Sequence, residues 1–316
     1  MRETTGRALA ARYGLGTPAG PPRYADRGER GQVWRLDTDR GRWAVKVTEV
    51  DPPAEEDASA QVAFQEAAAA AGVPLPRPVR AADGRVLARI DGVTYGVYEW
   101  VDLTGDAVTA AEIGTVAARL HTLGHPSPGP VHPWFAEPVG PAGWLALHRV
   151  AVDAGAWWAE PLRRLLPDLT ALDEVVTPPD PAATRTCHRD LNVENVRRTA
   201  AGPVTVLDWE NSGALEPVRE LAMVVVHLRE DVSDAAALSA YASYLDAGGP
   251  ARVTGPADFS TAIVVQGHLL RYYGERSLDP SAPAEDRERC DRRVRAALAG
   301  PLTPAAVDGL LSALPQ

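Results

Sequence analysis

The stretch CHRDLNVENVRRTAAGPVTVLDWENSG, residues 187–213, holds the polar residues that decide the fold class. Four residues separate Asp190 from Asn195, and twelve more separate Asn195 from Asp208. The pieces NVRRT (195–199) and PVTVLDW (203–209) read as two short strands of a hairpin. Such a hairpin would return Asp208 to the neighbourhood of Asn195, so that one pocket receives all three side chains.

This spacing is typical of kinase-type phosphoryl transfer. There an aspartate accepts the proton of the attacking hydroxyl, while an asparagine five positions on and a second aspartate after a hairpin hold magnesium ions. The pattern therefore predicts Asp190 as the catalytic base and Asn195 and Asp208 as Mg²⁺ ligands. Turn formation would account for each residue singly, since Asp and Asn are common in turns, but poorly for all three at these intervals.

Lys46, in the stretch RWAVKV (42–47), is the only lysine of the chain, and the other 31 residues of the Lys+Arg count are arginines. Lysine presents a compact ammonium on a slim stem, whereas arginine presents a wide planar fork. A buried site beside a phosphate is one place where this difference matters. Chance retention of one lysine is the alternative when the residue is considered alone.

Composition bounds the class of protein. The chain has 316 residues, of which 45% are hydrophobic and 23% charged, which is ordinary for a globular protein and enough for two lobes. Its two cysteines offer no disulfide framework, the N-terminal residues contain no apolar core of a signal peptide, and no apolar run approaches the length of a membrane span. We therefore expect a cytoplasmic protein without a membrane partner, as a monomer or homodimer.

The net charge of −10 is unevenly distributed. Residues 1–101 hold 14 acidic and 14 basic side chains, whereas residues 102–316 hold 28 acidic side chains against 18 arginines. The absence of a basic stripe that could neutralise phosphates argues against nucleic acid as a partner. The acidic excess favours a cationic ligand on the C-terminal part, with the general acidity of cytosolic proteins as the alternative.

Two textures follow each other along the chain. Up to about residue 101 the pattern predicts an alanine-rich helix over 54–71 between two pairs of strands, at 31–38, 41–50, 85–90 and 93–101. Beyond residue 108 helical spacing dominates, at 109–123, 144–166, 217–228, 236–248, 260–276 and 284–300. The fold class is therefore α+β, with a small antiparallel sheet and one helix followed by a larger, mainly helical part.

With these motifs the chain resembles the aminoglycoside phosphotransferase and choline kinase-like family of small-molecule kinases, which are relatives of protein kinases. The resemblance runs from GERGQVWRL through WAVKV, GVPLPRPV, VYEWVDLTG and AARLHTL, and is strongest in CHRDLNVENV and VLDWENSG. It implies a bilobal protein-kinase-like fold, with a nucleotide-binding lobe over residues 1–98, a hinge over 99–103 and a helical lobe with the catalytic loop and acceptor site over 104–316.

The resemblance also gives Lys46 a role. The lysine would pair the α- and β-phosphates of ATP or GTP while meeting a carboxylate from the helix over 54–71. Glu66, in the middle of that helix, is the first candidate for this carboxylate. Glu55 and Glu56 are the alternatives, with a solvated helix start as their other interpretation.

Two further parts of the nucleotide site follow from the resemblance. Gly28 and Gly31 would let the first hairpin approach the phosphates, unless they form an ordinary tight turn. Backbone groups from Glu99 to Val101 would hold the adenine or guanine base, with a strand free of ligand as the alternative.

The chain departs from the family pattern at two positions. Arg189 stands where the family usually has glycine, between the histidine and the aspartate of the catalytic loop, and Glu220 stands where it often has aspartate. Neither change removes a catalytic group, and both leave the subfamily open. We expect His121, in RLHTL, to be a packed helix histidine.

Only a few residues separate Asp208 from the helix that starts near Pro217, which leaves no room for the activation segment of a protein kinase. We therefore expect a phosphotransferase for a small hydroxylated acceptor, first an antibiotic in resistance or self-protection. A metabolic acceptor such as choline, homoserine or a sugar is the alternative. A nucleotide-binding pseudokinase is less favoured because Lys46, Asp190, Asn195 and Asp208 are all present.

The acceptor pocket is the least defined part of the sequence. Trp157, Trp158, Tyr272 and Tyr273 are candidates to line it, although packing in the helical core is the role favoured for each.

Overall fold

The computed structural model describes residues 1–28, 31–49, 52–127 and 129–315. Contacts divide the chain into two units: Met1–Val108 with Val193–Ser212, and Thr109–Asn192 with Gly213–Gln316. An antiparallel sheet in the first unit and helices in the second confirm the α+β fold class. The lobe and hinge boundaries proposed from the sequence, 1–98, 99–103 and 104–316, stay a prediction.

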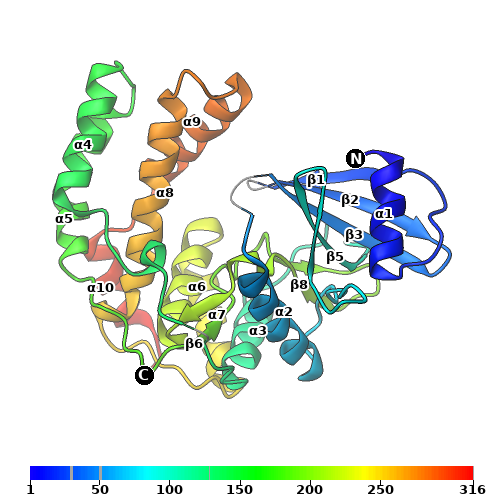
Figure 1. The fold of residues 1–316 in the computed structure, drawn as a ribbon. Helices are drawn as coiled ribbons and strands as arrows, with labels where there is room; N and C mark the ends of the chain where they lie inside the picture. Colours follow the sequence, from blue (N-terminus) through cyan, green and yellow to red (C-terminus); the bar gives the residue numbers. More distant parts are fainter. Residues whose placement is uncertain (29–30, 50–51, 128, 316) are drawn as a thin grey trace. The chain divides into compact units, whose positions relative to one another are not determined.

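The first unit is built on a five-stranded antiparallel sheet in the order β1-β2-β3-β5-β4 (Figure 1). Its strands are β1 Arg23–Arg27, β2 Gly31–Thr38, β3 Gly41–Thr48, β4 Leu87–Ile90 and β5 Val93–Glu99. Lys46 lies on the central strand β3, opposite Val33 of β2 and Gly96 of β5. The predicted strand over 41–50 is confirmed as far as Thr48, and its last residue, Val50, lies outside the described residues.

The β4–β5 hairpin follows from its turn residues. Asp91 and Gly92 have φ angles of 51° and 80°, so both occupy the left-handed region. A two-residue turn with positive φ at both positions matches the right-handed twist of the strands that it joins. The hairpin predicted from the Asp-Gly pair is thereby confirmed.

The described part of the first unit also contains the α-helices α1 Glu3–Tyr13 and α2 Glu55–Ala70. Helix α2 confirms the helix predicted over 54–71. Helix α1 was not predicted, and neither was β1. Leu9 and Tyr13, four residues apart on α1, are buried in the core of the sheet, and Gly14 ends the helix in the left-handed conformation.

A second hairpin, β7 Val196–Arg198 and β8 Val204–Val206, also belongs to the first unit. The amide of Val206 donates to the carbonyl of Pro74, 2.9 Å away, and the amide of Ala200 donates to that of Asp102 at 2.8 Å. The short helix η2 Trp209–Asn211 follows, and Trp209 packs edge-on against Phe64 of α2 with 5.4 Å between ring centroids. The hairpin predicted over 195–209 is therefore confirmed.

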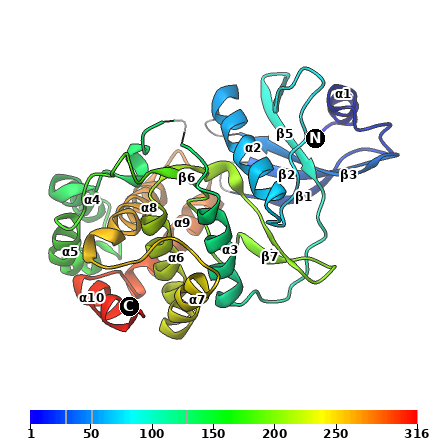
Figure 2. The same cartoon turned by 90° about the horizontal axis from the view of Figure 1, so that it is seen from below.

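The second unit consists mainly of helices. They are α3 Ala110–Thr122, α4 Gly140–Asp153, α5 Ala159–Asp173, α6 Pro217–Asp231, α7 Asp234–Asp246, α8 Ser260–Leu278, α9 Ala284–Ala299 and α10 Pro304–Ala313, with the short helices η1 Pro133–Phe135 and η3 Pro256–Phe259. Two short strands, β6 Arg185–Cys187 and β9 Gly213–Leu215, pair antiparallel. Helix α6 is buried on nearly all sides and lies beside α7 and α8 (Figures 1 and 2).

One predicted helix is divided. The helix expected over 144–166 is two helices, α4 and α5, because Gly155 adopts a φ of 62° between them. Trp144 of α4 and Trp158, just before α5, are buried together in one core cluster. None of the described helices combines the length and apolar character needed to cross a membrane.

Candidate active site

Lys46 sits between two carboxylates of the first unit. Its Nζ lies 2.8 Å from Oδ1 of Asp208 and 3.2 Å from Oε1 of Glu210, and its side chain is 25% exposed. The ring of Tyr98 lies with its centroid 5.9 Å from the same nitrogen. Burial lowers the pKa of Lys46, but Glu210 and Asp208 more than offset this, so the pKa stands above its ordinary value and the ammonium stays charged.

The hairpin β7–β8 places Asn195 and Asp208 at the same end. Val196 pairs with Val206, and the amide of Leu207 donates to the carbonyl of Asn195 at 2.7 Å. Asp208 then turns into the left-handed region, with φ 59° and ψ 58°. Backbone strain of this kind in a residue without a glycine's freedom is concentrated at functional sites. The turn directs the Asp208 carboxylate toward Lys46.

The donor set suits a hard divalent cation. Carboxylate and amide oxygens are the ligands that Mg²⁺ takes, and Asn195 and Asp208 supply one of each. Asp208 is 44% exposed and can be reached from solvent. These two residues would hold the ion, and the ion would supply charge neutralisation to nucleotide phosphates.

The structure corrects the expected pairing of Lys46 with Glu66. Nε and Nη2 of Arg80 donate to the two oxygens of Glu66 at 2.8 and 2.9 Å, and this bidentate hydrogen bond holds the pKa of Glu66 below its ordinary value. On α2 it is the neighbouring Gln65 that is buried, at 1% exposure. Glu66 thus lies on the outer side of the helix, and the carboxylates beside Lys46 come from Asp208 and Glu210.

The two alternatives to Glu66 are also accounted for locally. Glu55 accepts hydrogen bonds from the amides of Val86 and Leu87, 2.7 and 3.3 Å away. It therefore ties the start of α2 to the start of β4. Glu56 lies exposed in the first turn of α2, as expected of a solvated helix start.

Gly28 follows β1 and Gly31 begins β2, and the two residues between them lie outside the described residues. The amide of Gly28 donates to the carbonyl of Gly31 at 3.0 Å. A Cβ on Gly31 would lie 1.8 Å from the carbonyl oxygen of Val47, whereas a Cβ on Gly28 would meet nothing within 4 Å. The close approach of β2 to its paired strand β3 is enough to explain a glycine at position 31. The phosphate-binding role of both glycines stays a prediction.

The segment from Glu99 to Val101 leaves the sheet after β5. The amide of Glu99 donates to the carbonyl of Arg77 at 2.8 Å, and the amide of Trp100 donates to that of Arg42 at 3.0 Å. Both amides are therefore used within the protein. If the segment holds a nucleotide base, as predicted, its carbonyls and the amide of Val101 are the groups that would do so.

The loop predicted to be catalytic belongs to the second unit up to Asn192. Asp190 follows β6, and Nδ2 of Asn192 donates to its Oδ1 at 2.9 Å, which orients the carboxylate. Arg189 has a φ of 66°, a conformation in which glycine is favoured. The guanidinium lies 4.1 Å above the ring of Phe135, and a Cβ on Gly213 would lie 2.7 Å from its Nη2. The arginine is thus accommodated by an aromatic ring and by a glycine.

Glu220 of α6 holds this loop through a hydrogen bond to its backbone. It accepts a short hydrogen bond from the amide of Arg189, and Nε2 of His121 lies 2.7 Å from its other oxygen. Burial acts to raise the pKa of Glu220, but the hydrogen bond and charge of His121, the charge of His188 and the Arg189 amide hold it below its ordinary value. Nδ1 of His121 meets the hydroxyl of Tyr244 at 2.9 Å, so the histidine is packed and satisfied as predicted.

His121, Cys187 and Glu220 also form a group with ligand atoms within 4.8 Å of one another. Both nitrogens of His121 and both oxygens of Glu220 are already engaged in hydrogen bonds to protein groups. The group therefore fits a buried hydrogen-bond network better than a metal site.

Two residues of the site were missed by sequence reasoning. Glu210 lies beside Lys46, and Asn192 orients Asp190. Both stand inside the motif itself, at two positions past Asp208 and Asp190 respectively. A polar side chain two positions after a predicted site aspartate was the available signal for each.

The aromatic candidates divide between core and surface. Trp158 is buried, and Tyr273 packs against the same cluster, so the expected packing role is confirmed for both. Trp157 and Tyr272 are 41% and 43% exposed, so for them it is wrong. Trp157 donates from Nε1 to Oδ1 of Asp291 at 2.6 Å.

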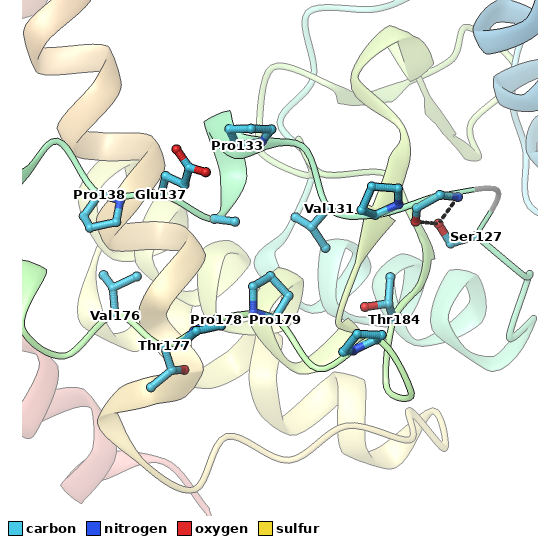
Figure 3. A pocket seen from close by; sticks show the side chains of 14 residues that line it. Ser127, Val131, Pro133, Glu137, Pro138, Val176, Thr177, Pro178, Pro179 and Thr184 are labelled. Carbon is cyan, nitrogen blue, oxygen red and sulfur yellow. Dashed lines mark hydrogen bonds between the residues drawn. The ribbon is translucent and has the colours of Figure 1, made fainter.

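A cavity of about 740 Å³ lies under proline-rich loops of the second unit (Figure 3). Pro133, Pro178 and Pro179 line it, and Glu137 is the one charged side chain among the described residues of its wall. Asp190 does not belong to that wall, and neither do the four aromatic candidates. We therefore do not assign the acceptor to this cavity.

Residues 23–255 match the model of the phosphotransferase enzyme family. This match covers more than two thirds of the chain and includes Lys46, Asp190, Asn195 and Asp208. The chain therefore belongs to the phosphotransferase enzyme family. An uncharacterized protein of Deinococcus radiodurans is 27% identical over 175 residues, which are 48% of this chain and 46% of that protein. The matched part thus spans about half the length of this curated relative.

Solved structures of small-molecule kinases share the fold. A spectinomycin phosphotransferase in complex with ADP and spectinomycin has a TM-score of 0.71 at 12% identity, covering 99% of this chain and 98% of its own. An amicoumacin kinase in complex with AMP-PNP, Ca²⁺ and a compound abbreviated Ami has a TM-score of 0.64 at 13% identity, with coverages of 97% and 96%. A microcompartment-associated aminopropanol kinase has a TM-score of 0.62 at 18% identity, with coverages of 94% and 95%.

Proposed function

We propose that this protein transfers the γ-phosphate of a nucleoside triphosphate to a hydroxyl of a small antibiotic. The donor is ATP or GTP in complex with Mg²⁺, and the reaction takes place in the cytoplasm. In this proposal Lys46 meets the α- and β-phosphates, and Asn195 and Asp208 hold the metal ion.

The observation that carries the proposal is the charge arrangement around Lys46. A single, partly buried ammonium lies within 3.2 Å of two carboxylates, one of which is a left-handed aspartate at the end of a hairpin that also presents Asn195. Phosphoryl transfer needs positioned cations around anionic phosphates more than it needs covalent chemistry. This set of residues supplies one fixed cation and the oxygen ligands for a second.

Asp190 completes the chemistry. Its carboxylate takes the proton of the acceptor hydroxyl as the oxygen attacks phosphorus, and Asn192 fixes its orientation through the 2.9 Å hydrogen bond. Glu220 and His121 hold the backbone of the loop in place from α6 and α3. These residues position the base and do not touch the reacting atoms.

The chain after Asp208 supports a small acceptor. Helix η2 occupies residues 209–211, β9 occupies 213–215, and α6 begins at Pro217. A protein kinase needs a long segment at this place to bind its peptide substrate. Here every residue between Asp208 and α6 lies in a short element or a tight connection between them, which leaves the acceptor to be bound among helices.

Two classes of acceptor compete. Spectinomycin and amicoumacin, the acceptors named for two kinases of this fold, are antibiotics, and the acidic excess over residues 102–316 favours a cationic molecule of this kind. The aminopropanol kinase supports the alternative of a small metabolic alcohol. A pseudokinase is disfavoured because the base and the predicted metal ligands are present.

A turnover screen tests the proposal. Purified protein is incubated with ATP or GTP and Mg²⁺, and with spectinomycin, amicoumacin, an aminoglycoside, a macrolide, aminopropanol, choline or homoserine. Formation of a phosphorylated product is followed by mass spectrometry, with Asp190→Asn as the inactive control. Phosphorylation of an antibiotic supports the proposal, and efficient phosphorylation of a metabolic alcohol alone replaces it with the alternative. Failure to bind either nucleotide with Mg²⁺ contradicts both.

A further inference from the structure

Lys46 faces more negative charge than a single partner requires. Asp208 and Glu210 both reach its ammonium, at 2.8 and 3.2 Å, and they differ in exposure, since Asp208 is 44% exposed and Glu210 only 26%. The better-exposed carboxylate is also the predicted metal ligand. Because the two carboxylates differ in their access to solvent, one can bind a metal ion while the other holds the lysine.

The main chain of Glu210 is fixed from α2. Nε2 of Gln61 donates to its carbonyl oxygen at 2.7 Å, and the ring of the preceding Trp209 packs against Phe64. Helix α2 thus contacts η2 through the side-chain amide of Gln61 and the ring of Phe64. No carboxylate among the described residues of α2 forms an ion pair with Lys46, and Glu66 pairs instead with Arg80.

We infer that Glu210 is the carboxylate that holds Lys46 in position while Asp208 serves the metal ion, so that the motif Asp-Trp-Glu takes over the pairing expected of a glutamate on α2. Glu210 is a positioning residue in this arrangement, because it acts on the nucleotide through Lys46. Gln61 transmits the position of α2 to it. The inference rests on the proposed nucleotide site but requires no particular acceptor.

The single lysine makes the contact directly observable. When the protein is labelled with ¹³C and ¹⁵N in lysine only, its spectrum contains the side-chain signal of one residue, Lys46. The chemical shifts of its Cε and Nζ report on the groups in contact with the ammonium. We expect Glu210→Gln to move this signal in the protein without nucleotide, and Glu66→Gln to leave it in place.

Glu66→Gln is a matched control, because the same chemical change is made on the helix where the partner was expected. Steady-state assays use an acceptor that the parent protein phosphorylates. In these assays Glu210→Gln is expected to lower kcat by about tenfold or more, whereas the kcat of Glu66→Gln should stay within about twofold of that of the parent protein. The KM for the acceptor should change little in both variants. Gln61→Ala should lower kcat by an intermediate amount.

The spectra also separate this inference from the proposed function. A Lys46 signal that responds to Glu66→Gln and ignores Glu210→Gln overturns the inference, whatever the acceptor. The same spectra recorded with Mg-ADP test the division of tasks, since Glu210→Gln must still displace the Lys46 signal when the nucleotide is bound. An unchanged signal in that state would mean that Glu210 releases the lysine, which also overturns the inference. If Mg-ADP does not bind to the parent protein, the proposed function fails while the apo comparison stands.

Discussion

At the scale of single residues, the site shows how a local conformation and a side chain are matched. Arg189 and Asp208 occupy the left-handed region, and a third residue of the described chain that does so without being glycine is Asp91 in a hairpin turn. Both motif residues are held by contacts that offset the backbone cost, Arg189 by Phe135 and Glu220, and Asp208 by Lys46. Burial lowers the pKa of Arg189 to about 10, with Glu220 acting in the opposite direction.

The role of Asp190 gives the first prediction. Asp190→Asn keeps the size of the side chain but cannot accept the proton of the attacking hydroxyl, so we expect turnover to fall by about 10²–10⁴-fold. Nucleotide affinity, measured by calorimetry with Mg-ADP, should stay near that of the parent protein, because Lys46, Asn195 and Asp208 are untouched. A variant with the parent turnover would show that Asp190 is not the base.

Lys46 gives the second prediction. In Lys46→Arg the planar guanidinium replaces a compact ammonium that lies within 3.2 Å of two carboxylates, and a fork of that width cannot keep both contacts while meeting phosphates. We expect a melting temperature near that of the parent protein without nucleotide and the loss of most turnover, with Lys46→Met no better. Melting curves and steady-state rates of the three proteins decide the matter, and full activity in the arginine variant would mean that charge alone suffices.

At the scale of elements, close packing explains the presence of several glycines that have no direct role in the proposed reaction. Gly31 permits β2 to approach its paired strand β3 closely, and Gly213 leaves space for the guanidinium of Arg189. Helix α3 packs on α7 in the same manner, since a Cβ on Gly114 would lie 2.0 Å from the carbonyl oxygen of Ala240.

Gly114 gives the third prediction. Gly114→Ala forces α3 away from the backbone of α7, and overpacking of this kind costs about 1–3 kcal/mol in the free energy of unfolding. Gly309→Ala in α10 is the matched control, because a Cβ there meets nothing within 4 Å and alanine is the better helix former by about 0.5–1 kcal/mol. Denaturant titration should therefore show opposite signs for the two variants. Equal effects would mean that the α3–α7 contact tolerates a methyl group.

The link between α3, α6 and the catalytic loop gives the fourth prediction. The pKa of Glu220 is below its ordinary value of 4.5 in the folded protein, so the carboxylate stabilises the fold above about pH 4.5 and this contribution is lost as the pH falls through the folded pKa. Glu220→Gln lacks the titration. We expect the melting temperature of the parent protein to fall more steeply than that of Glu220→Gln when the pH is lowered from 5 toward 3.

The other carboxylates are common to both proteins and cancel in this comparison. Parallel curves for the two proteins would mean that Glu220 is not held as a carboxylate by His121 and the Arg189 amide. A steeper curve for the variant would reverse the sign of the pKa shift.

At the scale of the whole molecule, a ligand that binds only the folded state must raise the melting temperature. This linkage amounts to about 2.7 kcal/mol at a ligand concentration one hundred times Kd. We predict that Mg-ADP raises the melting temperature of the parent protein by several degrees and leaves that of Asp208→Ala unchanged, because the variant lacks the charged metal ligand. Asp57→Ala, which removes an exposed carboxylate of the same unit, should keep the full shift. A shift of parent size in Asp208→Ala would place the nucleotide elsewhere.

The sequence predicted the fold class and the hairpins because strand alternation, the Asp-Gly turn and the interval from Asp190 to Asp208 are local patterns. It failed where a contact joins distant segments. The repeated alanines of α2 look alike on every side, so the pattern does not tell that Gln65 faces inward and Glu66 outward. Arg80, which captures Glu66, lies 14 residues further along the chain. Helix α1 was missed because only Leu9 and Tyr13 mark its buried side clearly.

The first unit is assembled from two stretches of chain, Met1–Val108 and Val193–Ser212, and so no contiguous gene segment encodes it. A crossover between related genes after codon 108 would import Lys46 and Tyr98 but keep the recipient's Asp208 and Glu210. The hybrid would hold only if the incoming Pro74 carbonyl and Gln61 amide still met the recipient's Val206 and Glu210. Recombination at that point therefore combines residues from two parent proteins within one cluster of charged side chains. Lys46 and Asp208 are in direct contact although 162 positions separate them in the sequence, so a recombinant keeps this contact only when both parents supply compatible residues.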